Sequence, residues 1–217
     1  AWDGITLNDD VEALSHSYDA VCFGTLARRR PISASTIERF VQNGADRGAV
    51  RMYDINLRSG ATGHDLIRRG LELASIAKMN DEELPVVAAM IGALPRDEAG
   101  RAGAIIRAFD LEQLVLTRGD RGVIVYTSDA AHEGAPSKAD ISAESDAVGA
   151  GDSCGAAYVI RMLRGDDPFA AASVANQVGA YVASHSGATP PLPAHVLGLT
   201  PTIEVVSGPA RRPAVDV

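Results

Sequence analysis

Four short apolar runs alternate with amphipathic stretches, and this alternation constrains the fold of the 217-residue chain more than any other feature. The runs cover 20–24, 49–55, 74–78 and 113–117, which is the length and composition of strands buried on both faces of a parallel sheet. The stretches at 35–43, 65–73, 81–90 and 99–109 have helical periodicity, with Pro85 in a first turn. The pattern predicts an α/β fold: a mostly parallel central sheet flanked by helices on both faces.

The second half of the chain departs from this alternation. A turn at 119–122 precedes a strand at 123–127 that can fold back as a hairpin, and 128–145 is a loop or an edge strand. Two successive helices are predicted at 153–164 and 168–184. We expect the chain, 1–217, to form a single nucleotide-binding and catalytic α/β domain.

Polar residues follow several of the predicted strands. Because ligands of open α/β sheets bind at the carboxyl ends of the strands, these residues are candidates for one shared site. They are Asp54, Asn56, Arg58, Lys78, Asn80, Glu83, Thr117, Arg118 and Asp120.

The sequence "VGAGD" at 148–152 leads into the first of the two late helices. Gly149, Ala150 and Gly151 allow a ligand to approach the backbone, and a helix beginning at Asp152 or Ser153 would direct free amides at an anion. Asp152 would then lie beside a bound phosphoryl group. The alternative is that Asp152 is only an N-cap, a position that aspartate favours.

Three further segments allow a functional and a structural interpretation. Asn80 and Glu83 are three residues apart and could hold hydrated Mg²⁺, or could cap a helix. The turn at 117–122 could contact a nucleotide while also forming a hairpin. Arg58 could bind a phosphate or a sugar acid, or could form a surface ion pair.

Taken together, these motifs resemble the ribokinase-like (PfkB) carbohydrate kinases. "DAVGAGDSCGAAY" is similar to the C-terminal motif of that family, and Asn80-x-x-Glu83, "TRGDRG" and "GATPPLP" follow in the family's order and separations. "VCFGTLARR" and "DINLR" look most like the fructokinase and 2-keto-3-deoxygluconate kinase branch. The joint resemblance extends from about Trp2 to Pro193.

The resemblance implies ATP-dependent phosphorylation of a sugar hydroxyl, with Asp152 as general base and the amides of Gly149, Ala150 and Gly151 as an anion hole. Asn80 and Glu83 would organise Mg²⁺ through water. The implied nucleotide-binding residues are Thr117, Arg118, Gly119, Asp120, Gly122 and Asn176. A monovalent cation, K⁺ in this family, would lie at Asp146, the Val148 carbonyl and the loop around Gly187.

The chain departs from the family pattern at several points. Ala147 replaces a usual Thr, Cys154 replaces a usual Phe, and Pro191 has no side-chain oxygen for a cation. Family members usually begin with a segment that carries a sugar-binding lid and a glycine-rich motif, and we expect that lid to be absent from this chain. The implied partners are a small-molecule sugar and ATP, and a homodimer is compatible with the resemblance.

Composition excludes several other classes of function. A formal charge of −8 disfavours a broad nucleic-acid-binding surface, and no apolar run approaches the roughly 20 residues of a membrane span. Two cysteines without a CxxC spacing and no visible leader predict a reduced, cytoplasmic chain.

Two alternatives to a kinase remain open from the residues. One is a regulatory module that binds a nucleotide without turnover. The other is a GDS-type esterase built on Ser153, although there the partner motif would follow the serine, whereas "DAAH" at 129–132 precedes it.

Overall fold

The computed structural model of the chain describes residues 2–58, 63–92 and 95–198. Its centre is one six-stranded sheet in which neighbouring strands are also consecutive in the sequence. The strands are β1 (Ala20–Gly24), β2 (Val50–Asp54), β3 (Ile76–Asn80), β4 (Gln113–Thr117), β5 (Val123–Tyr126) and β6 (Ala131–Glu133). The first four strands are parallel, and β5 and β6 join them as antiparallel strands.

Seven α-helices and three short 3₁₀ turns surround the sheet in the part of the chain that the structure describes. The α-helices are α1 (Asp9–Ser15), α2 (Pro31–Ala45), α3 (His64–Leu73), α4 (Glu83–Met90), α5 (Glu98–Phe109), α6 (Ala150–Leu163) and α7 (Pro168–Ala183). The 3₁₀ turns are η1 (Trp2–Gly4), η2 (Leu26–Arg28) and η3 (Gly119–Arg121). The predicted α/β class with helices on both faces is confirmed.

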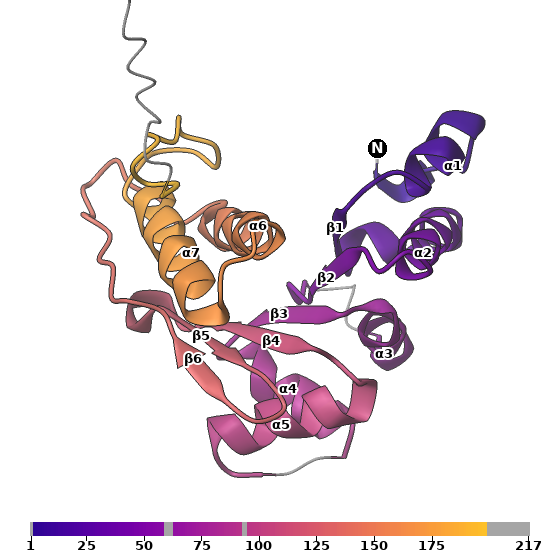
Figure 1. Ribbon diagram of the computed structural model, residues 1–217, viewed down its shortest axis with the longest axis horizontal. Coiled ribbons are helices and arrows are strands. Elements are labelled where there is room, and N and C mark those ends of the chain that lie inside the picture. Colours follow the sequence, from indigo (N-terminus) through magenta and orange to yellow (C-terminus); the bar gives the residue numbers. More distant parts are fainter. Residues whose placement is uncertain (1, 59–62, 93–94, 199–217) are drawn as a thin grey trace, which may run out of the picture.

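The order of the strands explains which helices cover which face. Crossovers between parallel strands are nearly always right-handed, so a sheet whose strands follow in sequence receives its connecting helices on one face. Helices α2, α3, α4 and α5 accordingly share one core with the sheet, while α6 and α7 lie side by side over the opposite face (Figure 1).

Side chains alternate between these two cores along each strand. Tyr53 and Met79 face the α2–α5 core. Met52, one position from Tyr53 on β2, and Ile76, three positions from Met79 on β3, face α6 and α7. Because both faces are covered, the parallel strands carry apolar residues at consecutive positions, which is the pattern that predicted them.

Several element boundaries differ from those predicted. Strand β3 begins and ends two residues later than the predicted 74–78, so Asn80 lies in the strand itself. Helix α4 begins at Glu83 rather than at residue 81, with Pro85 in its first turn as expected. Helix α6 begins at Ala150, so neither Asp152 nor Ser153 is its first residue.

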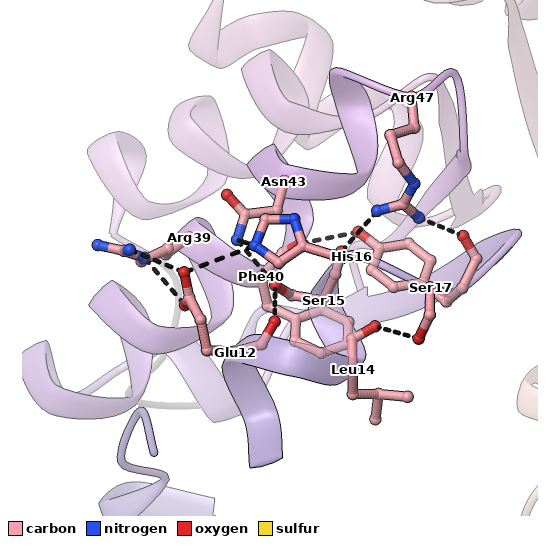
Figure 2. A network of polar contacts seen from close by, with 10 residues as sticks. Glu12, Leu14, Ser15, His16, Ser17, Arg39, Phe40, Asn43 and Arg47 are labelled. Atoms are coloured by element: carbon pink, nitrogen blue, oxygen red, sulfur yellow. Dashed lines mark hydrogen bonds and ion pairs between the residues drawn. The ribbon is translucent and has the colours of Figure 1, made fainter. Parts of the chain in front are cut away.

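Helix α1 was not predicted from the sequence. Asn8 caps it, because its side-chain oxygen accepts a hydrogen bond from the Val11 amide at 2.9 Å. The helix is fastened to α2 by side-chain contacts, including a two-bond ion pair between Glu12 and Arg39 (Figure 2). With only one buried residue, Ser15, it lacks the apolar stripe that would have revealed it.

In the part of the chain that the structure describes, no helix combines the length and the apolar character needed to cross a membrane.

Candidate active site

Polar residues from three parallel strands meet at the carboxyl edge of the sheet. Strand register places Asp54 beside Lys78 and Asn80 beside Thr117. They border a cavity of about 400 Å³. Its lining residues are Asp54, Asn56, Arg58, Lys78, Asn80, Glu83, Thr117, Ala147, Val148, Gly149, Gly151 and Asp152.

Gly149 is the N-cap of α6, and its conformation requires glycine. Its φ is +79°, in the left-handed region, and a Cβ there would lie 2.5 Å from the Ala188 carbonyl oxygen. The Ala150 amide donates to the Ala147 carbonyl at 3.3 Å and the Ser153 amide to the Gly149 carbonyl at 2.8 Å. The amides of Gly151 and Asp152, in the first turn, have no helical carbonyl partner and border the cavity, where they can bind an anion.

Asp152 lies in the first turn of α6 and is not the cap, so the interpretation of this residue as a plain N-cap is wrong. Its side chain is exposed, and it lines both the 400 Å³ cavity and an adjoining one of about 500 Å³. The adjoining cavity is mainly apolar and includes Gly24, Met52 and Ala156. Consider two ligands, one in each cavity, that react with each other across the boundary. A carboxylate at that boundary can accept the proton that one of them loses in the reaction.

Asn80 and Glu83 make the reciprocal hydrogen bonds of a capping box in the turn that leads from β3 into α4, whose N-cap residue is Glu82. The Asn80 side-chain oxygen accepts from the Glu83 amide at 2.8 Å, and Glu83 Oε2 accepts from the Asn80 amide at 2.9 Å. Glu83 Oε1 also accepts from the Leu57 amide at 2.6 Å and so ties the loop after β2 to the end of β3. The pair therefore has a structural role in holding the turn into α4, although Asn80 is not the N-cap that the structural interpretation expected.

The same pair still fits Mg²⁺ held through water. Both side chains line the cavity, and a carboxylate oxygen that accepts one amide keeps a second lone pair. Among the described residues no group of three or more His, Cys, Asp or Glu side chains could enclose a metal ion. The oxygen donors present suit an ion that keeps most of its water ligands and is also coordinated by the phosphate oxygens of a bound substrate.

The turn after β4 brings two predicted nucleotide-binding segments together. Gly119 and Gly122 have positive φ, and a Cβ on Gly122 would meet the buried Asn176 amide at 3.0 Å. Asn176 donates to the Ala135 carbonyl at 2.8 Å, while Asp120 lies in η3. Within this turn, Thr117 lines the cavity. Gly122 packs against Asn176, which lies on α7.

Arg118 is committed to ion pairs. Its guanidinium contacts Glu133 directly and Glu98 at 3.7 Å, and only 11% of its side chain is exposed. Arg58, by contrast, is exposed and lines both cavities, so its guanidinium can meet a ligand in either one.

Asp146 joins the loop before α6 to the loop after α7. Its carboxylate accepts from the Val148 amide at 3.0 Å and from the Gly187 amide at 2.9 Å. The three residues predicted for a monovalent cation site therefore lie together.

A buried ion pair between Lys78 and Asp54 was not assigned a role from the sequence. Lys78 Nζ lies 2.7 Å from Asp54 Oδ2. Burial by itself would lower the pKa of Lys78, but the charge and hydrogen bond of Asp54 outweigh it and raise that pKa. Burial raises the pKa of Asp54, and Lys78 opposes this shift. At 2.7 Å each group stabilises the charge of the other, and we treat both as ionised at neutral pH. The sequence did contain a signal for this pair, because Asp54 and Lys78 are charged residues near the ends of two consecutive predicted strands.

Comparisons with known proteins identify the family and the fold of the chain. The family model described as pfkB family carbohydrate kinase matches residues 7–195. Among curated protein sequences, a direct comparison finds no match.

Several solved structures share the fold. A 2-dehydro-3-deoxygluconokinase from Thermotoga maritima is 17% identical, with a TM-score of 0.75 over 87% of this chain and 61% of its own. A fructokinase with bound ATP from Xylella fastidiosa is 21% identical, with a TM-score of 0.72 over 87% of this chain and 63% of its own.

A fructokinase double mutant from Vibrio cholerae, with bound fructose, ADP and potassium, is 22% identical, with a TM-score of 0.68 over 84% of this chain and 61% of its own. The chain thus spans a little over three fifths of the length of these structures. At such identities the likeness establishes the ribokinase-like fold.

Proposed function

The chain belongs to the PfkB family of carbohydrate kinases, and from this we propose that it carries the phosphoryl-transfer site of an ATP-dependent kinase. The acceptor would be a hydroxyl of a small sugar or sugar acid. The observation that carries the proposal is the position of Asp152, an exposed carboxylate in the first turn of α6 that borders two adjoining cavities. We also propose that the chain acts as one nucleotide-binding and catalytic domain.

In the proposed reaction the acceptor hydroxyl lies within reach of Asp152, which takes its proton as the oxygen bonds to the γ-phosphorus of ATP. The bond from that phosphorus to the β,γ-bridging oxygen breaks, and ADP leaves with the electron pair. The expected anion hole was the amides of Gly149, Ala150 and Gly151, but the Ala150 amide donates to the Ala147 carbonyl. The free amides of Gly151 and Asp152 would therefore bind the negative charge of the transferred group. The carboxylate that accepts the proton and the amides that stabilise the negative charge therefore lie in the same first turn of α6.

Other residues of the site would bind and orient the substrates. The turn from Thr117 to Gly122, with Asn176 behind it, would border the nucleotide. Mg²⁺ bound through water at Asn80 and Glu83 would neutralise phosphate charge. The loops joined by Asp146 would take a monovalent cation, for which K⁺ is the candidate.

The acceptor class rests on Arg58. An exposed guanidinium beside Asp152 suits an acidic or polyhydroxylated sugar, because it can donate two parallel hydrogen bonds to a carboxylate. We assign the acceptor to the fructokinase-like branch because "VCFGTLARR" and "DINLR" resemble that branch. The similar structures include a 2-dehydro-3-deoxygluconokinase and a fructokinase, but also an aminoimidazole riboside kinase.

The first prediction concerns Asp152. We expect the natural full-length protein to release ADP only when a suitable ketose or sugar acid is present, and Asp152→Asn to lower kcat by roughly 10²–10⁴-fold, because loss of a general base has effects of that size. The measurement is coupled ADP release with a panel of sugars. Asp140→Asn, the same change in an exposed loop, is the matched control and should leave the rate unchanged.

Three results would contradict the proposal. A full-length protein that binds ATP without sugar-dependent ADP release would favour a nucleotide-binding regulatory module. An unchanged rate in Asp152→Asn would remove the carboxylate from the mechanism. Ester cleavage that disappears in Ser153→Ala would indicate a hydrolase instead.

A further inference from the structure

A lysine occupies a place in the sheet where the alternation calls for an apolar residue. On β3, Ile76 and Lys78 point to the same face, and Ile76 packs in the core under α6 and α7. Lys78 is only 5% exposed, so nearly its whole side chain lies in that layer. Buried lysines are rare unless paired, because removing an ammonium from water is costly.

The first turns of α6 are shaped around this side chain. Gly151 and Gly155, four residues apart on one helical face, both lie over Lys78. A Cβ on Gly155 would approach Lys78 Cδ to 3.0 Å, and a Cβ on Gly151 would lie 3.6 Å from Nζ. The lysine stem therefore runs under Gly155, and its ammonium ends beneath Gly151 in the first turn of the helix.

The charged groups around the ammonium are few. Asp54 pairs with it at 2.7 Å, and the Asp152 carboxylate also acts on it electrostatically. Lys78 and Asp54 both line the cavity that the open amides of α6 border. A fixed positive charge thus lies at the floor of the predicted anion hole.

Stability alone gives little reason for such a pair. Replacing a buried ion pair by apolar residues of similar volume is often neutral or stabilising, since the attraction between the charges only repays their desolvation. A charge held rigidly before a reaction begins is effective in stabilising charge that develops during it, because no reorganisation is needed.

We propose that the Lys78 ammonium completes the anion hole by binding the γ-phosphoryl group, with Asp54 as the positioning residue that fixes it under Gly151. This inference rests on the function proposed above and adds a residue to it. It assigns Lys78 to the phosphate that ATP has and ADP lacks, so ATP and ADP should respond differently to its removal.

The test compares the natural full-length protein with Lys78→Met/Asp54→Asn, which removes both charges and leaves no buried unpaired ion. Calorimetric titrations with ATP and with ADP, each with Mg²⁺, measure binding without any sugar. We expect the ATP dissociation constant to rise at least about tenfold and the ADP constant to change by less than about twofold, as for loss of one charge-assisted hydrogen bond to the γ-phosphate.

A matched control removes an ion pair at the opposite end of α6. Arg161 Nε lies 2.6 Å from Asp166 Oδ2 at the far end of the helix, and both side chains are mostly buried. Arg161→Met/Asp166→Asn should lower the unfolding temperature without changing the ratio of ATP to ADP affinity. Asp54→Asn alone keeps the ammonium but not its anchor, and should give an intermediate loss of ATP affinity.

The outcomes separate the two proposals. Equal losses for ATP and ADP, or no loss, in a folded double variant would overturn the role of Lys78 while leaving the kinase proposal intact. A natural protein that binds neither nucleotide would overturn the kinase function and the assignment of Lys78 with it.

Discussion

At the scale of single residues, Cys154 shows how position in α6 sets chemistry. The residue lies in the second turn, directly after the segment that forms the site, and is buried between the helix and the sheet. Burial raises the pKa of the Cys154 thiol from an ordinary 9.0 to about 11, and the Lys78 ammonium opposes only part of that shift. The thiol thus stays protonated at neutral pH, consistent with a packing role.

This pKa predicts how stability depends on pH. Above about pH 9 the unfolded chain loses the thiol proton while the folded chain keeps it up to about pH 11, so the folded state binds more protons and stability falls as pH rises. From about pH 8 to pH 10.5 we expect wild type to lose about 2 kcal/mol more than Cys154→Ala. Urea unfolding followed by circular dichroism at both pH values measures the difference.

Other buried groups also titrate in alkali, so only the difference between the two proteins reports on Cys154. Parallel pH profiles for wild type and variant would show that the thiol ionises alike in the folded and unfolded states.

At the scale of elements, the attachment of α1 to α2 depends on hydrogen bonds more than on apolar contact. Arg47, just after α2, donates to the carbonyls of Ser15 at 3.0 Å and Tyr18 at 2.7 Å, and its guanidinium lies 5.4 Å from the centre of the Tyr18 ring (Figure 2). Asn43 donates to the Ser15 hydroxyl at 2.7 Å. Of these contacts, the bond to the Ser15 carbonyl satisfies a group that the last turn of α1 leaves open, and the others fasten the Ser15 side chain and the segment after the helix.

We therefore expect Arg47→Met to lower the free energy of unfolding by about 1–2 kcal/mol, because two charge-assisted hydrogen bonds are lost from a partly exposed site. Amide hydrogen exchange in α1 should accelerate while exchange in β3 and β4 follows only the global change. Arg39→Met, which removes an exposed ion pair with Glu12, is the control and should have the smaller effect. Equal effects of the two variants would argue against a special role for the carbonyl contacts.

At the scale of the whole molecule, the final two helices complete the structure. The strands follow one another across the sheet, so α2 to α5 leave the opposite face open until α6 and α7 cover it. Tyr158 of α6 is fully buried there and donates to Gln113 of β4 at 2.7 Å. The helix that carries Asp152 is thus held on the sheet by the core of this face.

Removing that anchor should affect fold and site together. We expect Tyr158→Ala to lower the free energy of unfolding by about 3–5 kcal/mol, because a large cavity opens in the core. The thermal shift on adding ATP with Mg²⁺ should also decrease, since the first turn of α6 loses its support. Phe169→Ala on α7, where the ring is 51% exposed, is the aromatic control and should change stability by less than about 1 kcal/mol. If Tyr158→Ala lowers stability but leaves the ATP-induced thermal shift undiminished, the packing of this core does not support the ATP site.

Much of the fold could be predicted because its signals are local. The runs at 20–24 and 113–117 coincide with β1 and β4, and the predicted helix at 168–184 differs from α7 by one residue. The start of α6 was misplaced because Gly149, not a polar side chain, caps it. Helix α1 was missed because hydrogen bonds from α2 and Arg47 fasten it in place of an apolar stripe.

The sequence by itself determined the class of fold, the positions of most elements and the segments that supply the site. It could do so because a strand buried on both faces and a glycine-rich helix start each require particular residues at consecutive positions. Only the tertiary structure decided which polar groups meet. Lys78 joins Asp54 across 24 residues, Glu83 joins Leu57 across 26 and Gly187 joins Asp146 across 41. Such pairs depend on strand register and on how α6 packs, which the whole core sets.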